Sequence, residues 1–211
     1  MKSQSKIDEL IKTIKNDGLV IIPTDTIYGF SCLPTSKIAI DRITNLKQRV
    51  SKPFIVLDTD EDRMRDYFKY AFADKIFKEV INQKVWPGKL TIIADKCGKI
   101  DYPFLSGIST IAIRYPDSGF IDSICSGLKS GIVSTSINLS GQKELSSISE
   151  IKDMWQDKVD YVWEAETESN NSSLIINIDS WKKSIEIVRD PETVESKEIL
   201  LKLDKIVKKC Q

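Results

Sequence analysis

Three cationic side chains precede an apolar run in the stretch Lys47-Gln48-Arg49-Val50-Ser51-Lys52-Pro53-Phe54-Ile55-Val56-Leu57. The four apolar residues at its end are typical of a short buried strand. Charges at the start of a buried strand must be solvated, paired or available to an anionic ligand. Taken alone, the stretch favours an ordinary surface patch of lysine and arginine. The rest of the chain decides between such a patch and an anion site.

Outward from this strand, segments with helical spacing mix with short apolar runs along the whole chain. The first helical pattern should end at Gly18, and Ser147 to Glu150 fits a capping box that opens a later helix. This mixture, without strict alternation, favours an α/β or α+β fold with a twisted, open mixed sheet and flanking helices. The spacing predicts helices over residues 5–17, 36–46, 60–70, 74–85, 120–128, 148–155 and 195–209, and strands over 19–22, 54–57, 90–94, 110–115, 132–135, 159–162, 174–178 and 185–188.

The composition is that of an ordinary globular protein. The chain has 211 residues, of which 41% are hydrophobic and 29% charged, so we expect a single domain over residues 1–211. Basic and acidic residues balance at 31 each, so no overall field recruits nucleic acid and any anion site must be local. The longest apolar runs fall far short of a membrane span, which predicts a cytoplasmic protein with no membrane partner.

The chain contains no histidine. This excludes Ser-His and Cys-His nucleophilic machinery and every metal site that needs histidine. The four cysteines form no C-x-x-C pair, so no zinc site is expected, and Cys32 is interpreted as a small buried residue. The common phosphate loops, G-x-x-x-x-G-K-[ST] and G-x-G-x-x-G, are also missing. Any catalysis must therefore use cations, hydroxyls, backbone amides and a bound metal.

Small polar groups gather at the ends of three predicted strands. Thr24 to Tyr28 could bind a small polar ligand, or form a turn that satisfies its own backbone. Ser134 to Gly141 could direct hydroxyls and backbone N–H groups at phosphate oxygens, or be a serine-rich turn. Thr110 and Arg114 lie four apart and should share one face of a strand, with the arginine binding a ligand or simply solvated. The residues alone leave these alternatives open.

Five motifs in collinear order now carry a resemblance to the YrdC family. Pro23 to Phe30 resembles its P-T-[DE]-T-x-Y-G-L signature, and Lys47-Gln48-Arg49 resembles its K-x-R motif. Three further stretches, Trp86 to Thr91, Ile111 to Pro116 and Ser134 to Gly141, are similar to its W-P-G-P-x-T, x-A-x-R-x-P and S-T-S-A-N-x-S-G motifs. The motif-bearing core spans about residues 5–190.

The resemblance implies a fold and an activity. Family members are threonylcarbamoyl-AMP synthases, which use L-threonine, bicarbonate and ATP with Mg²⁺ to make threonylcarbamoyl-AMP and pyrophosphate. Their product serves the threonylcarbamoyladenosine modification of tRNA, so tRNA or downstream tRNA-modifying enzymes are implied as partners. Their fold is a twisted open sheet around a positively charged cavity. The length of this chain resembles the short, single-domain form.

The resemblance also assigns roles to residues. Lys47 and Arg49 are expected to be catalytic through their charge, and Mg²⁺ to arrive on the ATP phosphates. Among the departures from the family pattern, Val50, Ile137 and Ser173 replace its usual proline, alanine and threonine, the later S-T-x-x-D motif has no aspartate at its end, and Asp190-Pro191 follows Arg189. The residues implied to bind ATP are Lys47, Arg49, Lys52, Thr110, Ser136, Asn138 and Arg189, and those implied to bind L-threonine are Thr26, Arg114, Ser134 and Ser173.

Two other functions stay open from the sequence. Some carbamoyltransferases contain a YrdC-like domain that uses a carbamoyl adenylate, but in much longer chains. A non-catalytic, RNA-binding YrdC-like module is the second alternative, against which the neutral charge and the lack of an aromatic-basic stripe argue. The absence of histidine fits the synthase, because a carbamate that attacks the α-phosphate needs no covalent enzyme intermediate.

Overall fold

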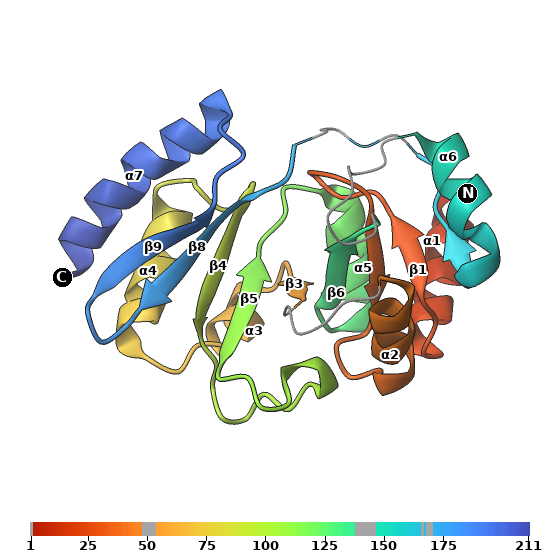
Figure 1. The fold of residues 1–211 in the computed structure, drawn as a ribbon, viewed down its shortest axis with the longest axis horizontal. Helices are drawn as coiled ribbons and strands as arrows, with labels where there is room; N and C mark the ends of the chain where they lie inside the picture. The colour runs from red at the N-terminus through yellow and green to blue at the C-terminus, as the bar shows by residue number, and fades with distance from the viewer. Residues whose placement is uncertain (1, 48–53, 138–146, 166, 168–170) are drawn as a thin grey trace.

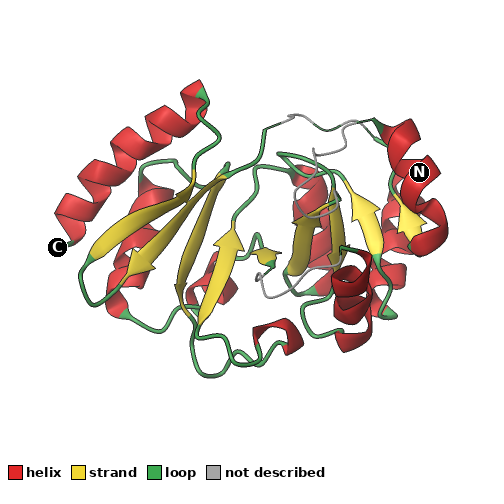
Figure 2. Ribbon diagram, in the orientation of Figure 1, coloured by secondary structure: helices red, strands yellow, loops and turns green. Residues whose placement is uncertain are grey.

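The computed structural model describes residues 2–47, 54–137, 147–165, 167 and 171–211 (Figures 1 and 2). Its helices are α1 (Lys2–Lys15), α2 (Lys37–Leu46), α3 (Glu61–Arg65), α4 (Ala71–Asn82), α5 (Gly119–Leu128), α6 (Ile148–Trp155) and α7 (Val194–Cys210), with 3-10 turns η1 (Pro103–Leu105) and η2 (Gln156–Lys158). Its strands are β1 (Val20–Ile22), β2 (Gly29–Cys32), β3 (Ile55–Leu57), β4 (Leu90–Asp95), β5 (Thr110–Arg114), β6 (Ile132–Ser136), β7 (Tyr161–Val162), β8 (Leu174–Asp179) and β9 (Ser184–Arg189).

One mixed sheet runs through these strands. Its order is β7-β1-β2-β6-β3-β5-β4-β8-β9, which confirms the expected single-domain α/β fold with an open sheet. The β1–β7, β3–β5 and β4–β8 pairs are parallel, and the other neighbours are antiparallel. The two chain ends lie at opposite ends of the molecule, beside β1 and β9 (Figure 1). Among the described helices, none is long and apolar enough to cross a membrane.

The helices cover the two halves of the sheet differently. Around β1, β2 and β6 the sheet is buried on both faces: α1 and α5 pack on one, through Leu10 and Ile124, and α2 and α6 pack on the other, through Ile43 and Ile151. Around β5, β4 and β8 one face packs on α4 and α7. The opposite face of that half is where the functional site forms.

Strand alternation sets which side chains reach that face. Successive residues of a strand point to opposite sides. On β4, Ile92 belongs to the core under α4 and α7, whereas Ile93 points the other way, into a cavity. On β5, Ile113 is a core residue and Arg114 lines the cavity. A one-residue shift in register would bury these side chains on the wrong side.

Three local expectations need correction. No strand was expected over residues 29–32, yet Gly29–Cys32 forms the buried strand β2. Gly18 does not supply the left-handed residue that ends α1; Asp17 does, with φ 60°. Gly18 is required for another reason, because a Cβ there would lie 2.5 Å from the Thr13 carbonyl oxygen. Ser147 is the N-cap of α6, but its side chain makes no capping hydrogen bond.

A buried carboxylate stabilises the centre of the fold. Asp58 follows β3 and is fully buried. Its Oδ2 accepts hydrogen bonds from Arg63 Nε at 2.7 Å and from the Tyr67 hydroxyl at 2.9 Å. Its Oδ1 accepts a bond from Arg63 Nη2 and bonds from the backbone N–H groups of Thr59 and Asp60. Burial beside this carboxylate raises the pKa of Tyr67 far above its usual value.

Candidate active site

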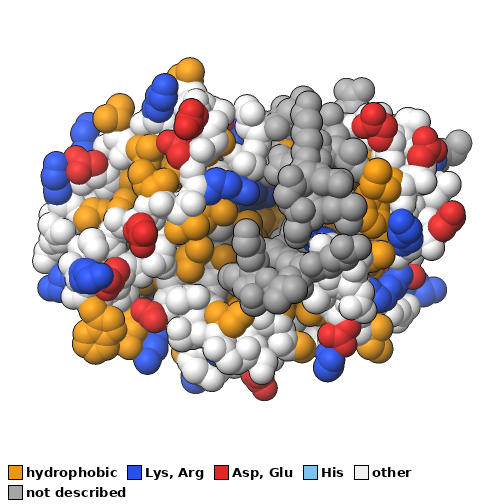
Figure 3. All heavy atoms as spheres, in the orientation of Figure 1, with side chains coloured by type: hydrophobic (Ala, Val, Ile, Leu, Met, Phe, Trp, Pro, Cys, Tyr) orange, Lys and Arg blue, Asp and Glu red, His pale blue; other side chains and the backbone are white. Residues whose placement is uncertain are grey.

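A cavity of about 540 Å³ lies at the middle of the sheet, where β2 and β6 meet β3, β5, β4 and β8. Its described lining contains two arginines and several hydroxyls, and no carboxylate. Basic side chains are visible in the hollow at the centre of this face (Figure 3). The lining residues are Thr24, Thr26, Ile27, Tyr28, Phe54, Ile55, Leu57, Ile93, Ala112, Arg114, Ser134, Thr135, Ser136, Ser172, Ser173, Ile175, Val188 and Arg189.

Arg114, at the end of β5, is the most buried cation of this lining. Its side chain is 6% exposed. Nη1 donates to Thr26 Oγ1 at 3.0 Å and Nη2 donates to Thr24 Oγ1 at 3.2 Å. Nε–H finds no acceptor among the described residues. A buried donor without an acceptor costs free energy, so Arg114 keeps a binding capacity that a ligand oxygen could satisfy.

Asp25 is the counter-charge of Arg114. Arg114 Nη2 lies 2.9 Å from Asp25 Oδ1 but directs no N–H at it, so that oxygen has no hydrogen-bond donor among the described residues. Burial raises the pKa of Asp25, and the nearby Arg114 opposes that rise. Burial lowers the pKa of Arg114, and Asp25 opposes that shift in turn. Each charge therefore keeps the other ionised inside the protein.

Strand β6 supplies a row of hydroxyls on the other side of the cavity. Ser134, Thr135 and Ser136 pair with β2, with Gly29 opposite Ser136. Gly29 permits this close approach, because a Cβ at that position would lie 2.4 Å from Ser134 Oγ. Lys47, at the end of α2, is 3% exposed and donates to the Ser136 carbonyl oxygen. The first residue of the K-x-R motif thus contacts the S-T-S strand.

A second group of contacts holds the loop before β8. Ser173 is fully buried, and its Oγ lies 2.8 Å from Thr91 Oγ1 on β4. Arg189, at the end of β9, donates through Nε and Nη2 to the Ser173 carbonyl oxygen at 3.1 and 2.9 Å. Nη2 also lies 3.2 Å from Ser173 Oγ. The late arginine and the serine of the threonine set therefore form one unit.

Six of the expected site residues line the cavity together: Thr26, Arg114, Ser134, Ser136, Ser173 and Arg189. Lys47 reaches it through Ser136. Thr110 stands at the far end of β5, opposite Asp95 of β4, and is not part of the described lining. Arg49, Lys52 and Asn138 lie outside the described residues.

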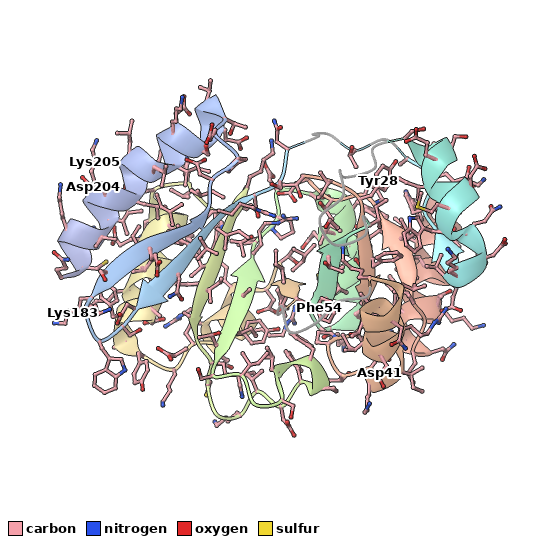
Figure 4. The ribbon with its side chains drawn as sticks, in the orientation of Figure 1. Tyr28, Asp41, Phe54, Lys183, Asp204 and Lys205 are labelled. Atoms are coloured by element: carbon pink, nitrogen blue, oxygen red, sulfur yellow. The ribbon has the colours of Figure 1, made fainter. Side chains whose placement is uncertain are left out.

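Other residues in or near the cavity were not among the expected ATP and threonine sets. Thr91 was quoted only within a motif, yet its hydroxyl meets Ser173. Tyr28 and Phe54 add aromatic surface to the lining, and Figure 4 labels both side chains. Ile137, which replaces a small residue of the family pattern, is 1% exposed and packs in the core with Phe30 and Trp155, not in the cavity. Cys32 is buried as expected, and burial raises the pKa of its thiol to about 12.

The likeness to known proteins covers most of the chain. The family model Sua5/YciO/YrdC, described as "Telomere recombination", matches residues 12–190. The chain belongs to this family. A curated threonylcarbamoyl-AMP synthase of Idiomarina loihiensis is 30% identical over 164 residues, which are 76% of this chain and 87% of that protein. This Sua5/YciO/YrdC protein therefore aligns with nearly the full length of that relative.

Two solved structures share the fold. E. coli YciO has a TM-score of 0.77 and 23% identity, with 89% of each chain covered. P. abyssi Sua5, solved in complex with L-threonine, has the same score and identity over 87% of this chain. The present chain spans 53% of that Sua5 chain. At this identity the two structures support the fold, and the family model supports the membership.

Proposed function

We propose that this protein is a threonylcarbamoyl-AMP synthase, a nucleotidyltransferase acting on L-threonine, bicarbonate and ATP to supply tRNA modification. The observation that carries the proposal is the charge of the cavity, whose described lining holds Arg114 and Arg189 and no carboxylate. All the proposed substrates carry anionic groups, which such a lining favours. The name of the Idiomarina relative and the L-threonine bound to P. abyssi Sua5 support the same activity.

In the proposal, L-threonine binds beside Arg114 and the phosphates of ATP bind beside Lys47 and Ser136. Arg114, with its Nε–H free of acceptors among the described residues, offers charge and a donor to the threonine carboxylate. Thr26, Ser134 and Ser173 surround it with hydroxyls. The nucleotide set consists of Lys47, Ser136 and Arg189, together with Arg49, Lys52, Thr110 and Asn138, whose roles rest on the motifs.

The proposed chemistry asks the protein for charge and position. The neutral amine of threonine and bicarbonate lose water to give a carbamate. A carbamate oxygen then forms a bond to the α-phosphorus of ATP as the bond to the β-phosphate oxygen breaks, and pyrophosphate leaves. Lys47 and its neighbours neutralise phosphate charge and hold the two anions in line. No side-chain nucleophile takes part.

Magnesium enters the proposal with ATP. Within the described part of the chain, no group of three or more acidic, histidine or cysteine side chains could hold a metal ion. Mg²⁺ is commonly bound mainly through nucleotide phosphates. When bound, it would spread the negative charge of the phosphates, and the cationic side chains of the cavity would share that task.

Mass spectrometry tests the proposal directly. The protein is incubated with ATP, Mg²⁺, bicarbonate and L-threonine, and the products are compared with those of the same mixture lacking threonine. We expect threonylcarbamoyl-AMP and pyrophosphate only when threonine is present. Formation of carbamoyl-AMP and pyrophosphate when carbamoyl phosphate replaces both bicarbonate and threonine, with no product from threonine, would favour the carbamoyl-adenylate alternative. Absence of any nucleotide product, together with retention of RNA on a filter, would favour the non-catalytic RNA module.

A further inference from the structure

Arg114 lies between two hollows of the protein. On one side is the 540 Å³ cavity, lined by Thr24 and Thr26. On the other side is a separate cleft of about 350 Å³, lined by Asp25 and formed with the Pro87–Gly88 turn and the first turns of α7. The segment 24–26 therefore sends its two hydroxyls toward the cavity and its carboxylate toward the cleft behind it.

The guanidinium of Arg114 is fixed from both sides. The two threonine hydroxyls accept its Nη1–H and Nη2–H from the cavity side, at 3.0 and 3.2 Å. Asp25 lies 2.9 Å from Nη2 and is 3% exposed. Asp25 is itself held, because its Oδ2 accepts the backbone N–H of Asp117 at 3.3 Å. The carboxylate thus has a defined position behind the guanidinium.

The hydroxyls alone cannot replace the carboxylate. They accept hydrogen bonds but carry no charge, and a buried guanidinium without a counter-charge is strongly disfavoured. Asp25 is not among the residues that line the cavity, so its contact with that side is made through its pair with Arg114.

We propose that Asp25 is a positioning residue that holds Arg114 charged and aimed at the carboxylate of the amino-acid substrate. This inference rests on the proposed function and deepens it: Asp25 sets the affinity for threonine without touching it. Asp25→Asn keeps the shape of the side chain and removes its charge. Asp117→Asn makes the same change at an exposed carboxylate of the same cleft, keeps the backbone N–H that Asp25 accepts, and serves as the matched control.

The acid dependence of threonine binding gives a second readout. Because burial raises the pKa of Asp25 above its usual value, Asp25 takes up a proton earlier than an exposed aspartate as the pH falls. Protonation removes the counter-charge, so threonine affinity should fall as the pH is lowered from about 7 to about 4. The charged groups that face Asp25 from its surroundings are Arg114, Lys84, Lys89, Asp117, Glu195, Glu198 and Lys202.

Calorimetric binding of L-threonine and steady-state pyrophosphate release test the inference. For Asp25→Asn we expect the Kd and KM for threonine to rise at least about tenfold, the KM for ATP to stay within about twofold, and the acid dependence to disappear. Asp117→Asn should match the wild type. The double variant Asp25→Asn/Arg114→Lys should bind threonine no more weakly than Arg114→Lys alone, because both changes act on one unit.

Several results would overturn the inference. Wild-type threonine affinity in folded Asp25→Asn, or equal losses for threonine and ATP, would do so. If Asp25→Asn does not fold, the pH dependence of threonine binding by the wild type still tests the inference. A threonine Kd that is unchanged down to about pH 4 contradicts the role of Asp25. The proposed function fails separately, when the wild type itself releases no threonine-dependent pyrophosphate.

Discussion

Two of the aspartate–arginine pairs in the described part of the chain, Asp58–Arg63 and Asp25–Arg114, are joined through a backbone hydrogen bond and differ in how completely they are bonded. Asp58 follows β3 and Arg114 ends β5, and the Asp58 N–H donates to the Arg114 carbonyl oxygen at 3.1 Å. In the Asp58–Arg63 pair both carboxylate oxygens accept hydrogen bonds. In the Asp25–Arg114 pair, Asp25 Oδ1 and Arg114 Nε have no hydrogen-bond partner among the described residues.

The difference distinguishes a pair that stabilises the fold from a pair that can bind a ligand. Bonding to Asp58 raises the pKa of Arg63 above its usual value, whereas burial lowers the pKa of Arg114. A saturated network stabilises one arrangement and has nothing left for a ligand. An unsaturated buried pair costs free energy unless something else binds to it, which makes it a candidate for function. The two pairs should therefore respond oppositely to mutation.

The largest expected effect is on stability. Asp58→Ala removes the acceptor for Arg63, Tyr67 and two backbone N–H groups. We expect the free energy of unfolding to fall by about 3–5 kcal/mol, as when a buried ion pair loses one partner. Asp60→Ala, which removes the N-cap of α3 and a 3.5 Å exposed ion pair with Arg63, should cost about 1 kcal/mol. Urea denaturation followed by circular dichroism measures both. Equal losses for the two variants would contradict the special role of Asp58.

The next largest effect is on activity. Arg114→Gln should lower kcat/KM for threonine at least about 100-fold, or about 2.7 kcal/mol, because a neutral amide cannot compensate a carboxylate. The matched change at the neighbouring pair, Arg63→Gln, should lower stability and leave kcat/KM per folded molecule within about twofold. Pyrophosphate release at limiting threonine measures both. If Arg63→Gln is as inactive as a folded Arg114→Gln, the division between the pairs is wrong.

Lys47, a buried cation like Arg114, extends the comparison to the nucleotide side. Lys47→Ala should lower turnover at least about tenfold, or about 1.4 kcal/mol, because the variant loses a positive charge that neutralises the ATP phosphates. The control is Lys37→Ala in the same helix, whose side chain is 72% exposed and pairs with Asp41, and which should behave as the wild type. The same change at Arg49 is expected to act like Lys47→Ala. Near-normal pyrophosphate release by both Lys47→Ala and Arg49→Ala would contradict the proposed role of these two side chains at the ATP phosphates.

The sequence predicts the members of the site better than the contacts between them. Motif order places Thr26, Ser134 and Ser173 in or beside strands, and a sheet brings strands from distant parts of the chain together. The pairing of Asp25 with Arg114 was not predictable, because it depends on β5 ending opposite the segment after β1. The strand β2 was not predicted because it is short and starts at Gly29. Glycine usually indicates a turn, but here its missing side chain leaves room for the Ser134 hydroxyl.

The smallest expected effect concerns the orientation of the Ser134 hydroxyl, which lies next to Gly29 in the sheet. In Gly29→Ala the new methyl group would lie 2.4 Å from Ser134 Oγ, the mobile end of a short side chain. That hydroxyl can turn away at little cost, so stability should change by less than about 1 kcal/mol. The turned hydroxyl no longer faces threonine, so the KM for threonine should rise several-fold, by about 1 kcal/mol.

Gly98→Ala is the control for this change, because nothing lies within 4 Å of a Cβ there. Steady-state kinetics with threonine as the varied substrate, and thermal unfolding of the same samples, separate the two effects. An unchanged KM in Gly29→Ala would mean that Ser134 is a support like Asp58. A raised KM for threonine at unchanged stability would mean that Ser134, like Arg114, binds the ligand.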